Sequence, residues 1–178
     1  MKNFKDIVFF GALWGLAEAT LGFLLHLVVV PITGLFMFPI GFFLMRQVRL
    51  KTGSRTSPAQ IAVIAAAIKL VNLFFTPLWI DVVNPSVAIL LEGLFVAILL
   101  SKTEHETLPR MVGATYGWRL SYIAMLSVQA LSGLKIRLFA AGLTKVLQYV
   151  TIDVLANVAL VFLIARFSPK WEFEIKPS

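Results

Sequence analysis

The sequence predicts an all-α integral membrane protein, a bundle of six transmembrane helices with both termini in the cytoplasm. Of its 178 residues, 59% are hydrophobic, and the mean hydropathy of the chain is +0.88, which is typical of a protein embedded in lipid. A bilayer core about 30 Å thick needs roughly 20 mostly apolar residues to span it. Six such stretches follow one another with short loops between them, so residues 1–178 are predicted to form a single transmembrane domain.

Prolines lie at or next to the ends of these stretches, where a missing backbone N–H is least costly. Ser57-Pro58 and Asn84-Pro85 are typical helix starts, a capping residue followed by proline. Pro39 lies inside the second stretch and predicts a short or kinked helix there. In chain order, the predicted spans are residues 6–30, 31–48, 58–79, 85–101, 109–132 and 138–166.

The first span follows two lysines, as the apolar part of a secretory signal would. Its apolar segment is longer than that of a signal, it contains Glu18, and no A-x-A cleavage site follows it. We therefore expect this segment to be retained as a helix.

Lysine and arginine residues collect in the loops of one face, which predicts the orientation because positively charged loops stay in the cytoplasm. With six spans, the opposite face holds only Lys135 and Arg137. Both termini are therefore predicted to be cytoplasmic, in a multi-pass protein of the cell membrane. The net charge of +7 is mostly this topology signal, with some affinity for anionic lipid headgroups. Nucleic acid is not an expected partner, because no basic polar surface with interleaved aromatic residues is present.

Six ionisable residues lie inside the predicted spans, where each is costly unless it faces the bundle interior or a wet cavity. Three are acids and three are bases: Glu18, Lys69, Glu92, Arg119, Lys145 and Asp153. We expect Arg119 in the inner half of the membrane, Lys145 in the outer half, and the other four near its middle. They either pair with one another and lock the bundle or line a binding site.

Polar residues concentrate from the middle of the membrane to the outer face, as expected for a pocket that is loaded from outside. Both charge signs are present, so a zwitterion or a heteroaromatic acid suits the pocket better than a bare ion. His26 and Trp79 are also compatible with a simple interfacial position. The residues predicted to bind the small-molecule substrate are Glu18, His26, Asn72, Trp79, Asp81, Asn84, Glu92, Lys145 and Gln148.

Motifs for several kinds of chemistry are missing from the sequence. It contains no G-x-x-x-x-G-K-[ST], no H-E-x-x-H, no G-x-S-x-G and no cysteine. We therefore expect no catalytic residue, metal site or cofactor, and no enzymatic activity.

The first span carries a stripe of small residues at helical spacing, Gly11, Gly15, Ala19 and Gly22, along which another helix can approach closely. Two interpretations are open. The stripe packs against another helix of the same bundle, or Gly11, Gly15 and Ala19 form a docking surface for a separate membrane subunit.

Over its whole length the chain resembles the substrate-binding S components of energy-coupling factor (ECF) vitamin transporters. The resemblance consists of the size of the chain, its six spans, the small-residue stripe, and polar outer loops such as WIDVVNPS. That family commonly carries A-x-x-x-A where this chain has Gly11, Gly15 and Ala19. The resemblance implies capture of a vitamin or similar small molecule from outside. It also implies a transmembrane coupling subunit and two cytoplasmic ATPases as partners, with the stripe as the coupling contact.

Two other functions are compatible with the same residues. The chain could be a scaffold subunit whose charges only hold helices together. Alternatively, it could be a small ion- or proton-coupled carrier in which Glu18 and Glu92 titrate, although the inverted repeats common in such carriers are not evident.

Overall fold

The computed structural model describes residues 3–27, 33–100, 107–134, 136, 139 and 142–168, and within them the chain is helical with no strand. The all-α prediction is therefore confirmed. In chain order the elements are α1 (Phe4–Leu27), α2 (Thr33–Thr52), α3 (Ser57–Lys69), the 3-10 helix η1 (Leu70–Phe74), α4 (Ile80–Leu99), α5 (Leu108–Leu131) and α7 (Leu143–Phe167).

Three described segments are long and apolar enough to cross a membrane, by length and composition: Ser57–Phe74, which is α3 with η1, Ile80–Leu99, and Thr144–Phe167. This fits a membrane protein. Six crossings remain a prediction.

The helix bounds correct one prediction about a proline and narrow another. The fourth helix begins at Ile80 and not at Pro85, which lies inside it. The carbonyl that would accept a hydrogen bond from residue 85 belongs to Asp81, an exposed residue of the first turn. At Pro39 a short or kinked helix was expected; the helix is not short, because it continues through Pro39 for 20 residues, and a kink there stays a prediction.

The third predicted span also differs from a single α-helix. The α-helix ends at Lys69 and tightens into η1, after which the Phe75 amide donates to the carbonyl of Asn72. Pro77 follows two residues later, and a proline disfavours helical backbone in the residue before it.

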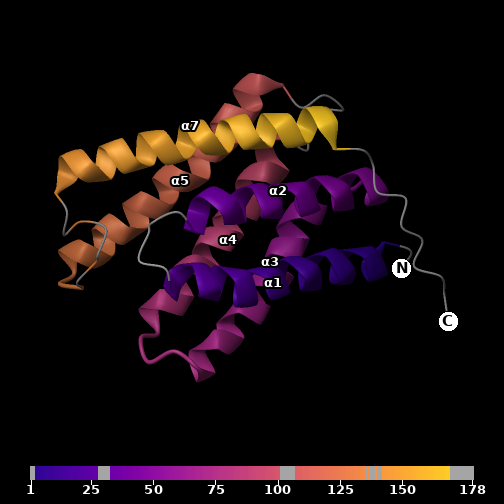
Figure 1. Ribbon diagram of the computed structural model, residues 1–178. Coiled ribbons are helices and arrows are strands. Elements are labelled where there is room, and N and C mark those ends of the chain that lie inside the picture. Colours follow the sequence, from indigo (N-terminus) through magenta and orange to yellow (C-terminus); the bar gives the residue numbers. More distant parts are fainter. Residues whose placement is uncertain are drawn as a thin grey trace.

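The start of α1 and the ends of α2 and α7 lie together at one end of the bundle (Figure 1). Here Lys51 pairs with Asp6 at 2.9 Å, and Arg46 Nη1 donates to the carbonyl of Ser168 at 3.0 Å. Arg49 donates to the carbonyl of Leu100, just beyond α4. This end therefore gathers three of the basic residues that the sequence assigns to one side of the membrane.

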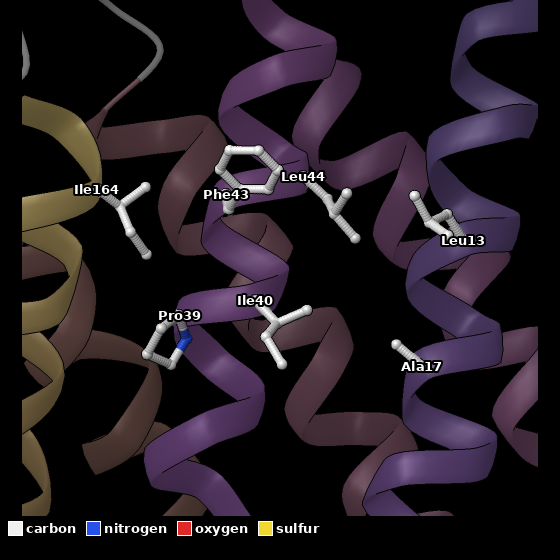
Figure 2. Close-up of a pocket in the computed structure, with 7 residues that line it drawn as sticks. All are labelled: Leu13, Ala17, Pro39, Ile40, Phe43, Leu44 and Ile164. Atoms are coloured by element: carbon white, nitrogen blue, oxygen red, sulfur yellow. The ribbon is translucent and has the colours of Figure 1, made fainter. Parts of the chain in front are cut away.

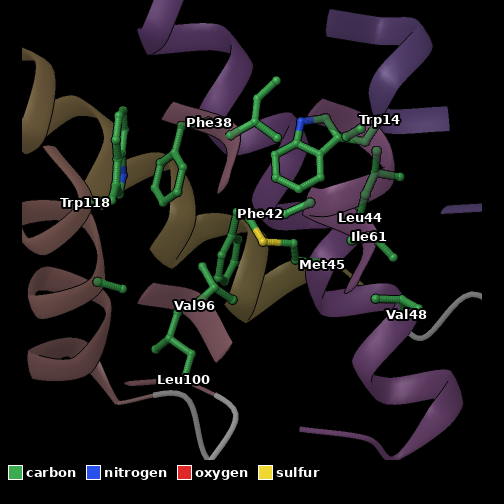
Figure 3. Close-up of a cluster of buried hydrophobic side chains, with 14 of the residues drawn as sticks. Trp14, Phe38, Phe42, Leu44, Met45, Val48, Ile61, Val96, Leu100 and Trp118 are labelled. Atoms are coloured by element: carbon green, nitrogen blue, oxygen red, sulfur yellow. The ribbon is translucent and has the colours of Figure 1, made fainter. Parts of the chain in front are cut away.

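The apolar core lies between α1, α2, α3, α4, α5 and α7 and is built around large side chains (Figure 3). Trp14, Phe38, Phe42 and Trp118 are each at most 1% exposed, and the rings of Phe38 and Trp118 are 5.1 Å apart between centroids. In lipid, water exclusion gives little driving force between helices, so close packing of this kind must hold them together.

The contact between α1 and α3 is made through glycines. A Cβ added at Gly11 would lie 2.7 Å from the Cβ of Ile64, and one at Gly15 would lie 2.7 Å from the Cβ of Ile68. Both distances are shorter than side chains tolerate, so the two backbones approach as closely as glycine allows. Of the two interpretations of the small-residue stripe, packing within the bundle is the one found at Gly11 and Gly15.

Candidate functional site

A buried polar cluster crosses the middle of the bundle. Its six side chains come from α1, α3, α4, α5 and α7, and none is more than 6% exposed. We define the cluster as Glu18, Lys69, Glu92, Arg119, Asp153 and Asn157.

Glu18 of α1 lies opposite Lys69, the last residue of α3. The Lys69 Nζ is 4.0 Å from Glu18 Oε2 and also donates to the Glu18 carbonyl. A Cβ at Gly22 would lie 3.2 Å from each of these charged atoms, Oε2 and Nζ, so the glycine leaves room for the pair. The negative charge of Glu18 is therefore compensated within the chain, by Lys69 and not by Arg119 or Lys145.

Arg119 of α5 pairs with Asp153 of α7. Its Nη2 donates to Asp153 Oδ2, and its guanidinium lies 4.1 Å from the centre of the Trp118 ring. One turn further along α7, Asn157 Nδ2 donates to the Asp153 carbonyl at 2.9 Å. The pairing brings Arg119 to the level of Asp153; its place in the inner half of the membrane stays a prediction.

Glu92 of α4 lies between these two pairs, within electrostatic range of Glu18, Arg119 and Asp153. It is 5% exposed, and its Oε2 has no hydrogen-bond partner among the described residues. No ion pair of the described residues includes it.

Six buried polar side-chain atoms in the described part of the chain have no hydrogen-bond partner. Three are donors: Trp118 Nε1, Arg119 Nε and Trp14 Nε1, the last of which lies beside the Glu18 carboxyl. Three are acceptors: Glu92 Oε2, Asp153 Oδ1 and Asn157 Oδ1. Buried polar atoms are nearly always partnered, so a group of both kinds in one bundle is chemically able to hold a small polar molecule.

Two predicted binding residues toward the other end of the bundle are engaged with neighbouring helices. Asn84 and Gln129 exchange two amide hydrogen bonds, of 3.0 and 2.9 Å, between α4 and α5. Asn72 Nδ2 donates to the carbonyl of Ala19 at 3.2 Å. These side chains hold helices together in this structure.

The remaining predicted residues do not converge with the cluster. Trp79 is 55% exposed, and Asp81, Lys145 and Gln148 are exposed as well. Lys145 is therefore not inside the bundle as predicted, although it lies within the candidate span Thr144–Phe167. The side chain of His26 lies outside the described part of the chain.

Two hollows lie away from the cluster. The larger, about 390 Å³, is a groove between α1, α2 and α7 (Figure 2). It is lined only by apolar residues, Leu13, Ala17, Pro39, Ile40, Phe43, Leu44 and Ile164, and so does not suit a polar solute. The other, about 340 Å³, lies along α7 beside Gln148.

Four polar side chains of this part of the bundle were not predicted from the sequence: Gln129, Asn157 and the indoles of Trp14 and Trp118. Asn157 had a detectable signal, because it lies four residues after Asp153 and therefore on the same helical face. Gln129 had none, since its partner Asn84 is 45 residues away.

No group of three or more His, Cys, Asp or Glu that could hold a metal ion occurs among the described residues. No family model, curated protein or solved structure matches the chain.

Proposed function

We propose that the protein is a membrane transport protein that captures a small polar molecule from outside, as the substrate-specific S component of an ECF-type importer. The observation that carries this proposal is the buried polar cluster with its unpartnered donors and acceptors. Polar groups inside a membrane bundle are expensive and commonly mark substrate pathways. A bundle that only holds helices together gains nothing from donors and acceptors that lack partners.

The chemistry of these atoms suggests the class of solute. An acidic group would accept from Arg119 Nε and from the indole N–H of Trp118. Donor groups of the same molecule would meet Asp153 Oδ1 and Asn157 Oδ1. A zwitterion or a heteroaromatic acid carries both kinds of group in a small volume.

The energy source is the part of the proposal that rests on the resemblance. The chain has no P-loop sequence, so pumping by ATP would need the coupling subunit and ATPases of an ECF transporter. Because Gly11 and Gly15 pack on α3, we place the coupling contact on the outward face of α1, where Leu16 is 56% exposed.

Native mass spectrometry of the full-length protein, extracted from its own membrane in a mild detergent, tests solute binding. We expect a co-purifying small molecule in the wild type and in Lys145→Ala, whose side chain is exposed. Asp153→Asn should lose it, because the acceptor and the charge that orients Arg119 are changed. An empty wild-type protein that no compound stabilises in a broad thermal-shift screen would contradict the proposal and favour a scaffold.

Uptake of the identified molecule into cells separates the two kinds of transporter. An ECF-type importer should stop when ATP is depleted and should continue when a protonophore collapses the proton gradient. The opposite result would assign the chain to the proton-coupled carriers.

A further inference from the structure

The buried polar cluster contains an odd number of ionisable groups. Three are acids, Glu18, Glu92 and Asp153, and two are bases, Lys69 and Arg119, all at most 6% exposed. Lys69 faces Glu18 and Arg119 faces Asp153. With every group ionised, the described interior would therefore carry one uncompensated negative charge, and Glu92 is the acid without a base of its own.

The helices beside Glu92 are closely packed. A Cβ at the next residue, Gly93, would lie 2.2 Å from the Cβ of Ala62 on α3. On the other side, a Cβ at Gly117 of α5 would lie 2.3 Å from the ring of Phe95. Glu92 itself is 5% exposed, and an isolated carboxylate in such a closely packed place is especially costly.

Titratable groups surround Glu92 on the helices packed against α4. Those that interact with it electrostatically are Glu18 on α1, Arg119 and Tyr122 on α5, and Asp153 on α7. Beside these groups lie Lys69 on α3 and Tyr149 on α7. On α2, Arg49 lies at the other end of α4, where it donates to the carbonyl of Leu100. Among these residues, both bases already face another acid.

We propose that Glu92 is a proton-binding site in the membrane interior. A divalent metal would need several ligands, and the described residues offer no group of three. A proton needs one carboxyl group and no cavity. With it bound, the cluster holds two acids and two bases as charged groups, which cancel, and Glu92 gains an O–H that is able to donate a hydrogen bond.

Release of this proton to bulk water would change the partner available to Arg119. Glu92 lies within electrostatic range of Arg119, so an ionised Glu92 would compete with Asp153 for the guanidinium. The proton would thereby bias the contact between α5 and α7, the helices that Arg119 and Asp153 join. This inference goes beyond solute capture and does not depend on it.

Infrared difference spectroscopy of the full-length protein in lipid nanodiscs, between neutral and high pH and without any solute, tests the proposal. We expect a protonated carboxylic acid C=O band at neutral pH that shifts in D2O and is absent from Glu92→Gln. Asp81→Asn, which changes an exposed acid outside the cluster, should keep the band. A wild type without this band at neutral pH, or a band that persists in Glu92→Gln, would overturn the proposal.

A further variant covers the case in which Glu92→Gln does not fold. Glu92→Asp keeps a carboxyl group but shortens the side chain by one methylene, so the band should remain and move in frequency. An unmoved band in Glu92→Asp would assign the proton to another acid and refute the inference.

Discussion

Gly15→Ala tests the close contact between α1 and α3. The new Cβ would lie 2.7 Å from the Cβ of Ile68 and 3.1 Å from the Cα of Ala65, and the second atom cannot move aside unless the helix shifts. Overpacking destabilises proteins by about 1–3 kcal/mol, whereas alanine in place of a helical glycine gains about 0.5–1 kcal/mol. We therefore expect the free energy of unfolding to fall by roughly 0–2.5 kcal/mol.

Gly113→Ala on α5 is the matched control, because a Cβ there would meet only Leu99 Cδ1, at 3.5 Å, an ordinary contact. It should gain about 0.5–1 kcal/mol, so the two variants should differ by about 1–3 kcal/mol, the overpacking cost alone. Reversible unfolding in mixed micelles, followed by tryptophan fluorescence, measures both. If Gly15→Ala were as stable as Gly113→Ala, the glycine face would not be packed on α3, and the docking-surface interpretation would return.

Three further predictions use the same unfolding measurement. Arg119→Met should lower the free energy of unfolding by about 3–5 kcal/mol, because it leaves the buried Asp153 carboxylate without a counter-ion. Adding Asp153→Leu should recover most of that loss; strictly additive effects would show that the pair does not interact. Asn84→Leu should lower the free energy of unfolding by about 1–2 kcal/mol, because it leaves the Gln129 amide without a partner. The same substitution made in the Gln129→Leu variant should cost less; an equal loss there would argue against the amide pair. Lys145→Ala should change stability by less than about 0.5 kcal/mol, as expected for an exposed side chain, and a larger loss would place Lys145 inside the bundle.

The helical fold could be predicted because its signal is local. Apolar stretches of about 20 residues are visible without any knowledge of contacts, and Pro58 and Pro109 do lie in the first turns of their helices. Pro85 was misleading, because the helix begins five residues before it and continues through it.

The members of the candidate site could be predicted more easily than their partners. A charge within an apolar stretch is conspicuous, so Glu18, Lys69 and Glu92 were found from sequence alone. Which base faces which acid depends on how the helices are rotated, and the sequence does not contain that directly. Lys145 shows the limit, because it lies one position from Val146, which is 3% exposed, yet its own side chain is exposed.

The ion pair between α5 and α7 has a consequence for how the protein is made. Arg119 and Asp153 are 34 residues apart in the chain, and a ribosome adds about 5–20 residues per second. Arg119 must therefore wait roughly 2–7 s before its counter-ion is even synthesised. On the six-span prediction, α5 carries an unpaired guanidinium during that interval, so we expect it to remain beside the translocon or against earlier helices and to enter the lipid together with α7.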